Sequence, residues 1–301
     1  MDSLAPADVP TGVPPPPEPA PDRRPHPQGP SPTGGHQLAA RMTTAAVGIP
    51  LTVVPVVLGV PWLVIACAVV ILIGLTEFYG MTGRAGYQPV WEAGMAAGVL
   101  LAVQAAWPQP WQLAILPAMF IYTIAVQLRR GRPERVLANT AITILGVLYV
   151  GFLFSFILRL RALDVGSFRL GGPALLVIFV VWAADSVAYF VGSIAGKHKL
   201  LPRVSPNKSW EGAGGGVVAG IAAGIICGWM FGMPLAMAAG VGGLCAAASI
   251  FGDLWESAIK RDAGVKDAGS ILPGHGGILD RFDGLLFAMV AGYFAIRWWR
   301  I

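Results

Sequence analysis

The chain has 301 residues, of which 55% are hydrophobic and 12% charged, and its mean hydropathy is +0.65. Soluble globular proteins seldom combine these values, and the apolar residues come in runs that can cross a bilayer, which takes about 20 residues of helix. The formal net charge of +5 does not require nucleic acid as a partner, because Lys and Arg on the cytoplasmic loops of a membrane protein explain it.

The first 37 residues differ from the rest of the chain. They are rich in Pro, with Pro14 to Pro17 consecutive, and hold almost no large apolar side chains. Such a segment cannot bury enough surface to offset its loss of entropy on ordering, so we expect residues 1–37 to form a disordered cytoplasmic tail. A Pro-rich tail that binds a partner is the alternative. Residues 38–301 are expected to form a single transmembrane domain.

Long charge-free runs fill most of that domain. They cover Met42–Thr76, Ala93–Leu128, Val136–Leu158 and Gly212–Gly252. Turn residues divide three of these runs, and further spans fit roughly 171–195 and 284–299, which gives about nine helices. We therefore predict an all-α, polytopic integral membrane protein. A cytoplasmic N-terminus places most Lys and Arg on the inner face, so we expect a multi-pass protein of the inner (plasma) membrane with its charged motifs facing the cytoplasm.

Polar residues begin to gather after residue 180. Asp185 lies inside an apolar span, where an ionisable group is a functional hypothesis, and a buried hydrogen bond to Ser or Tyr is the alternative. The segment from Ser205 to Gly212 leads into a helix that Ser209 could cap, and Lys208 adds positive charge near its N-terminus. Gly212, Gly216 and Gly220 have the spacing of a helix contact face; a phosphate cradle over Gly212–Gly216 is the alternative.

Asp253, Glu256 and Lys260 share one face of a helix, at offsets of three, four and seven residues. Asp253 directly follows a long apolar run, where a carboxylate needs a partner: Lys260 on the same face, a polar group from another helix, or a bound cation. The cation is favoured because Lys260 is nearly two turns away. For Glu256, a structural ion pair with Lys260 and a functional role are equally plausible. Two more acids, Glu77 and Glu92, lie near span ends and receive no role.

Asp280 and Asp283 directly precede the final span. Either could simply cap the helix, but together with Asp253 they would supply hard oxygen ligands for Mg²⁺. Gly276 and Gly277 follow His275 in a turn that could form an anion-binding nest of backbone N–H groups. His275 could donate to phosphate, act as a general acid or be structural. Four nearby cations could neutralise phosphate charge: Lys260, Arg261, Lys266 and Arg281.

These residues form a pattern of fixed spacing. Its C-terminal part is Ser257, Lys260-Arg261, Lys266-Asp267, Gly269, Leu272-Pro273, His275-Gly276-Gly277 and Asp280-Arg281-Phe282-Asp283. Its upstream part is Asp185-Ser186, Ala188-Tyr189, Gly192, Gly196 to Leu200, Ser205-Pro206, Lys208 and Trp210-Glu211-Gly212. The pattern, over roughly residues 40 to 301, resembles the bacterial phosphatidate cytidylyltransferases, also called CDP-diacylglycerol synthases. Ser209 stands where Thr is usual in that family, and Ser193 where a basic residue is frequent.

The resemblance implies an enzyme that makes CDP-diacylglycerol and pyrophosphate from CTP and phosphatidate, in phospholipid biosynthesis and with Mg²⁺ as cofactor. It assigns Mg²⁺ to Asp253, Asp280 and Asp283 and leaves open whether a second cation binds. The implied catalytic residues are Asp253, Asp280, Lys260, Lys266, Asp267 and His275. The implied substrate-binding residues are Asp185, Ser205, Lys208, Glu211, Ser257, Arg261, Gly276, Gly277 and Arg281. The individual roles of His275 and Asp267 stay open.

Three other functions are alternatives for such a sequence. A membrane transferase that uses CTP on an isoprenoid or archaeal-type lipid has the same chemistry, and motifs separate it poorly. A transporter for an anionic solute should hold charges near mid-membrane and show related halves, whereas here the charges gather at one face. A scaffold without activity is disfavoured by the dense Asp, Lys and Gly cluster. Acyl-chain preference and the formation of a homo-oligomer are left open.

Overall fold

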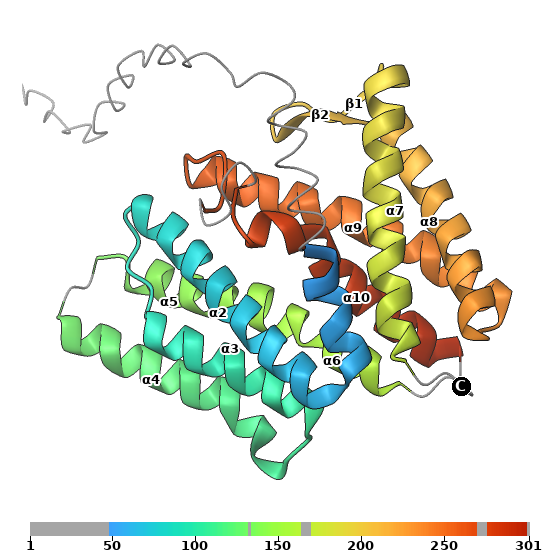
Figure 1. Ribbon diagram of the computed structural model, residues 1–301. Helices are drawn as coiled ribbons and strands as arrows, with labels where there is room; N and C mark the ends of the chain where they lie inside the picture. Colours follow the sequence, from blue (N-terminus) through green and yellow to red (C-terminus); the bar gives the residue numbers. More distant parts are fainter. Residues whose placement is uncertain (1–47, 132–133, 164–169, 270–275, 300–301) are drawn as a thin grey trace, which may run out of the picture.

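The structure is a computed structural model that describes residues 48–131, 134–163, 170–269 and 276–299 (Figure 1). The expected tail over residues 1–37 and the predicted site residue His275 lie outside the described residues. Apart from one small hairpin, the described elements are helices. The helical class is therefore confirmed.

The N-terminal helices form one group, shown in blue and green in Figure 1. A short apolar helix, Gly48–Leu58, precedes α2. The elements that follow are α2 (Val60–Arg84), α3 (Trp91–Ala106), the 3₁₀ turn η1 (Pro110–Ala114), α4 (Ile115–Arg130), α5 (Val136–Gly146), the π-helical turn η2 (Val147–Phe152) and α6 (Phe156–Ala162).

The C-terminal elements form a second group. They are α7 (Gly172–Ala195), β1 (Lys199–Leu201), β2 (Ser205–Ser209), α8 (Trp210–Phe231), α9 (Leu235–Asp262) and α10 (Leu279–Trp299). Helices α7, α8 and α9 pack in sequence order, and α10 packs on α9 and α7. Because α10 also contacts α6 and α2, it joins the two groups (Figure 1).

Six helical segments of the described residues are long and apolar enough to cross a membrane. They are Val60–Arg84, Pro110–Arg130, Val136–Ala162, Gly172–Ala195, Trp210–Phe231 and Leu235–Asp262. Large apolar side chains on them, such as Ile194, Val218 and Trp229, are exposed, as expected of helices that face lipid. Two further apolar helices, Gly48–Leu58 and α3, are shorter. The fold is thus that of a polytopic membrane protein, while the number of nine spans stays a prediction.

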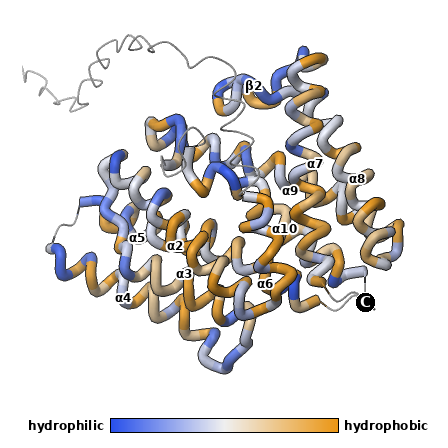
Figure 2. The backbone as a smooth tube through the Cα atoms, viewed as in Figure 1, coloured by the Kyte–Doolittle hydropathy of each residue, from blue (hydrophilic) through white to orange (hydrophobic). Residues whose placement is uncertain are grey.

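The hairpin of β1 and β2 is a departure from the all-α prediction. The two strands pair antiparallel, with Lys199 opposite Ser209 and Leu201 opposite Ser205. This segment is too polar to continue into the bilayer, so its backbone groups pair with each other instead. Figure 2 shows hydrophilic residues at the hairpin and at the adjoining ends of α9 and α10, while the lengths of the helices are mostly hydrophobic.

Glycines let α8 lie against its neighbours. Gly212, Gly216, Gly220 and Gly224 are all buried. A Cβ at Gly216 would lie 3.0 Å from the carbonyl oxygen of Ala184 on α7, and a Cβ at Gly220 would lie 2.9 Å from that of Gly242 on α9. The prediction of a helix contact face is therefore confirmed for this stripe.

Candidate active site

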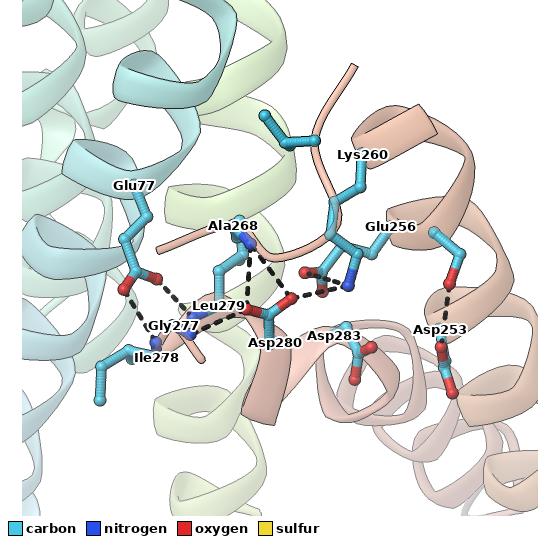
Figure 3. A network of polar contacts seen from close by, with 12 residues as sticks. Glu77, Asp253, Glu256, Lys260, Ala268, Gly277, Ile278, Leu279, Asp280 and Asp283 are labelled. Atoms are coloured by element: carbon cyan, nitrogen blue, oxygen red, sulfur yellow. Dashed lines mark hydrogen bonds and ion pairs between the residues drawn. The ribbon is translucent and has the colours of Figure 1, made fainter. Parts of the chain in front are cut away.

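The acidic residues of α9 and α10 come together because the two helices touch. A Cβ at Gly252 would lie 2.6 Å from the carbonyl oxygen of Asp283, and a Cβ at Gly284 would lie 3.0 Å from that of Ser249. Side chains larger than hydrogen at these two glycines would push the helices apart. The contact places Asp283 of α10 beside Asp253 of α9, with which it interacts electrostatically (Figure 3).

Asp280 is the most heavily bonded acid of this site. Its carboxylate accepts hydrogen bonds from Lys260 Nζ at 2.6 Å, from the backbone N–H of Gly277 at 2.8 Å and from that of Ala268 at 3.0 Å. Burial alone would raise the pKa of Asp280, but the bonds from Lys260 and Gly277 outweigh it and hold the pKa below its ordinary value. Asp280 therefore fixes both the loop before α10 and the Lys260 ammonium group.

Lys260 and Glu256 form the ion pair that their spacing on α9 predicts. The Lys260 nitrogen lies 3.3 Å from Glu256 Oε1, and the same nitrogen donates to Asp280. Glu256 is fully buried, and besides the Lys260 ammonium group its carboxylate contacts the carboxylate of Asp280. An acid in this state is costly unless another group completes its surroundings, so the ion pair alone does not explain Glu256.

Asp253 connects α9 to the hairpin. Its carboxylate pairs with the ammonium group of Lys208 on β2, and Ser257 donates a hydrogen bond of 3.4 Å to it. Asp185 on α7 interacts electrostatically with both Asp253 and Lys208. Three clusters that lie far apart in the sequence, around residues 185, 208 and 253–283, thus meet at one place in the structure.

The end of the hairpin is also tied to this region. Ser209 caps α8, as predicted, because its Oγ accepts a hydrogen bond of 3.1 Å from the Gly212 backbone N–H. Glu211 Oε1 lies 2.6 Å from His198 Nδ1, which closes the base of the hairpin. Arg261 at the end of α9 donates to the carbonyl oxygen of Val204, between the two strands. Ser205 begins β2.

The remaining predicted residues border the cluster. Lys266, Asp267 and Arg281 are exposed, and Gly276 has a positive φ of 79°. Gly277 donates its N–H to Asp280, so this amide already has an acceptor and is not left open for an anion.

Glu77, to which no role is assigned from the sequence, also belongs to the site. Glu77 of α2 is only 5% exposed, and its carboxylate accepts the backbone N–H groups of Ile278 at 3.0 Å and Leu279 at 2.8 Å (Figure 3). The only signal in the sequence was an acid placed at the end of a 35-residue charge-free run, Met42–Thr76. That signal predicts a partner for the acid but does not identify it.

The donor set fits a hard divalent cation. Five carboxylates, those of Asp185, Asp253, Glu256, Asp280 and Asp283, face two lysines, Lys208 and Lys260. This surplus of carboxylate oxygens over ammonium groups suits Mg²⁺. Over the described ranges, no three His, Cys, Asp or Glu side chains already converge on one point. Mg²⁺ needs only one or two protein carboxylates when substrate phosphate and water supply the other ligands.

Comparisons with known proteins agree with one another. Residues 39–299 match the model of the Cytidylyltransferase family. The chain is 32% identical over 288 residues to phosphatidate cytidylyltransferase 5, chloroplastic, of Arabidopsis thaliana, with 85% of this chain and 71% of the plant protein covered. It is 31% identical over 284 residues to the phosphatidate cytidylyltransferase of Synechocystis sp., with 85% and 95% covered. It is 42% identical over 159 residues to that of Bacillus subtilis, with 50% and 56% covered.

Proposed function

The chain belongs to the cytidylyltransferase family, and on this premise we propose that it is a phosphatidate cytidylyltransferase. The family expected from the sequence motifs is confirmed. The substrates are CTP and phosphatidate, and the products are CDP-diacylglycerol and pyrophosphate. One observation carries the proposal: carboxylates and cations from α7, β2, α9 and α10 gather beside helices that are long and apolar enough to cross a membrane.

The chemistry requires two anions to meet. An oxygen of the lipid phosphate attacks the α-phosphorus of CTP, and a new O–P bond forms. The bond from that phosphorus to the bridging oxygen of the β-phosphate breaks, and its electron pair leaves with pyrophosphate. The attacking phosphate is already ionised, so no strong general base is needed. The barrier is mainly charge repulsion and alignment, which positioned cations lower.

The positions of the side chains indicate which of them bind phosphate and which bind the metal. Lys208 and Lys260 hold positive charge inside the site, and the exposed Arg261, Lys266 and Arg281 add it at the border. We assign these five residues to the phosphates of the two substrates. Asp253 and Asp280, with Asp283 beside them, are the proposed ligands of Mg²⁺. When bound, the metal supplies Lewis-acid stabilisation of phosphate charge.

The other site residues predicted from the sequence are assigned as follows. Asp185, Ser205, Glu211, Ser257 and Gly276 are assigned to substrate binding, whereas Gly277, also predicted to bind substrate, is assigned to the turn that Asp280 holds. Asp267 and His275 are assigned to the site without a defined role.

The proposed orientation follows the distribution of charge. The hairpin, the end of α9 and the start of α10 carry the site and most of its Lys and Arg residues. We place this end of the molecule in the cytoplasm, where CTP is available, with a cytoplasmic N-terminus and nine spans of the inner (plasma) membrane. A tag at Ile301 is then accessible from outside the cytoplasm. Labelling of that tag from the cytoplasm would require an even number of spans.

Incorporation of labelled CTP into lipid tests the function. Purified protein in detergent is given CTP labelled in the cytosine ring and either phosphatidate or an isoprenoid monophosphate, with Mg²⁺ or with EDTA. We expect label in lipid only with phosphatidate and Mg²⁺, together with an equal amount of pyrophosphate. Transfer to the isoprenoid phosphate alone would assign a different lipid substrate, and transfer in EDTA would remove the metal from the proposal.

A further inference from the structure

Glu77 is a buried acid in the N-terminal group of helices, and among the described residues its hydrogen-bond partners lie at the start of α10. Its two oxygens accept the N–H groups of Ile278 and Leu279, the residues at the start of α10. These amides lie at a helix N-terminus, where N–H groups lack acceptors within the helix and favour negative charge. The contact therefore stabilises the buried carboxylate and fixes the first turn of α10.

A second carboxylate holds the same segment from the other side. Asp280 accepts the N–H of Gly277, so three consecutive backbone amides, from residue 277 to residue 279, are bound by two acids from different halves of the molecule (Figure 3). Asp280 is the next residue after them, and Asp283 follows one helical turn later. A rotation of this segment would therefore move both proposed metal ligands.

The loop is also shaped around the Glu77 side chain. A Cβ at Gly277 would lie 2.6 Å from Glu77 Oε2, and a Cβ at Gly269 would lie 2.7 Å from Glu77 Cδ. No real Cβ approaches this closely, so an alanine at either position would displace the carboxylate or the loop. Gly269 and Gly277, eight residues apart in the sequence, therefore both lie against one carboxylate.

We propose that Glu77 is a positioning residue for nucleotidyl transfer, which acts through the amides of Ile278 and Leu279 to fix the orientation of Asp280 and Asp283. This inference rests on the proposed function and adds to it a contribution from the N-terminal half of the chain. Glu77 touches no substrate in this role. Its effect reaches the reaction through the geometry of α10, because a displacement of about 1 Å in a site can lower the rate about a hundredfold.

The first test compares Glu77→Gln with Glu92→Gln, which removes an exposed acid from the same half of the chain. Glutamine has one acceptor oxygen, and its NH₂ group would face a backbone N–H. We expect Glu77→Gln to lower kcat at least about thirtyfold and Glu92→Gln less than about twofold. Hydrogen–deuterium exchange should quicken at least about tenfold in peptides that contain Ile278 and Leu279, with α8 unchanged. Unchanged exchange at Ile278 and Leu279 would overturn the proposal.

The second test does not depend on the folding of Glu77→Gln. Gly269→Ala should lower kcat at least about tenfold, because the new methyl group meets Glu77. In the double variant with Glu77→Asp, the shorter acid withdraws from that methyl group. If the two changes acted independently, the relative kcat of the double variant would equal the product of the relative kcat values of the single variants. We expect the measured kcat of the double variant to be at least about threefold higher than that product. Independent, multiplicative effects would contradict a shared contact.

These tests separate the two proposals. If wild-type protein transfers no cytidylyl group to phosphatidate, the proposed function fails. The exchange rates of Ile278 and Leu279 still decide whether Glu77 fixes the start of α10.

Discussion

The two ends of the acidic cluster are built differently. At one end, Asp280 accepts hydrogen bonds from Lys260, Gly277 and Ala268, and its side chain is only 10% exposed. At the other end, Asp253 pairs with Lys208 of the hairpin and receives one long bond from Ser257, and its side chain is 40% exposed. Asp280 thus stabilises the loop before α10 as well as the site, whereas Asp253 contributes little to the stability of the fold.

The difference indicates how the site can be held in shape while substrates bind and leave. The Asp280 end is held by Lys260 and also by two backbone amides, which no substrate replaces. At the Asp253 end the partner is a lysine, and a bound cation could take its place while Lys208 turns to phosphate. Substitutions at the two ends should therefore separate effects on stability from effects on activity.

The largest effect is expected from Asp280→Asn. It removes a proposed metal ligand, and an NH₂ group would replace an acceptor of Lys260 or of the Gly277 and Ala268 amides. Turnover should fall at least about a hundredfold and the free energy of unfolding by about 1–3 kcal/mol. CTP incorporation and thermal unfolding of the same detergent-purified sample measure both. Near-normal turnover would remove Asp280 from the proposed metal site.

Asp253→Asn should affect activity alone. The side chain is partly exposed, so its ion pair with Lys208 contributes less than about 1 kcal/mol to stability. Turnover should still fall at least about a hundredfold, because a proposed metal ligand is lost. A loss of stability equal to that of Asp280→Asn would contradict the comparison of the two ends.

Lys208→Met should have an intermediate effect. The substitution keeps the length of the side chain and removes the charge that pairs with Asp253. We expect kcat/KM for CTP to fall about tenfold to a hundredfold, as for the loss of one charge-assisted phosphate contact. Lys199→Met, in the facing strand β1, is the matched control and should change kcat/KM less than about threefold. Equal losses in both variants would point to a general effect of charge on the hairpin.

The smallest effect is expected from Lys266→Ala. Lys266 is exposed at the border of the cluster, where solvent screens its charge. The KM for CTP should rise about twofold to fivefold with kcat unchanged, and the increase should shrink in high salt. A large loss of kcat instead would place Lys266 inside the site, with Lys260.

Much of the site could be predicted because its signals are local. The spacing of Glu256 and Lys260 on one helix offers an ion pair as one of two interpretations, and the place of Ser209 before α8 offers a cap; the structure shows both contacts. The hairpin was missed because its two strands are short and polar, without an alternating apolar pattern. Glu77 was missed for a different reason. Its partners Ile278 and Leu279 lie 201 and 202 residues away, and no local pattern joins them.

The binding of CTP to purified protein, measured by calorimetry with and without Mg²⁺, tests most directly whether the α9–α10 cluster holds metal and nucleotide together. We predict that Mg²⁺ tightens the binding of CTP at least about tenfold in the wild-type protein and less than about twofold in Asp253→Asn. An equal gain in CTP affinity on addition of Mg²⁺ in both proteins would contradict the proposal that Asp253 helps to hold metal and nucleotide together.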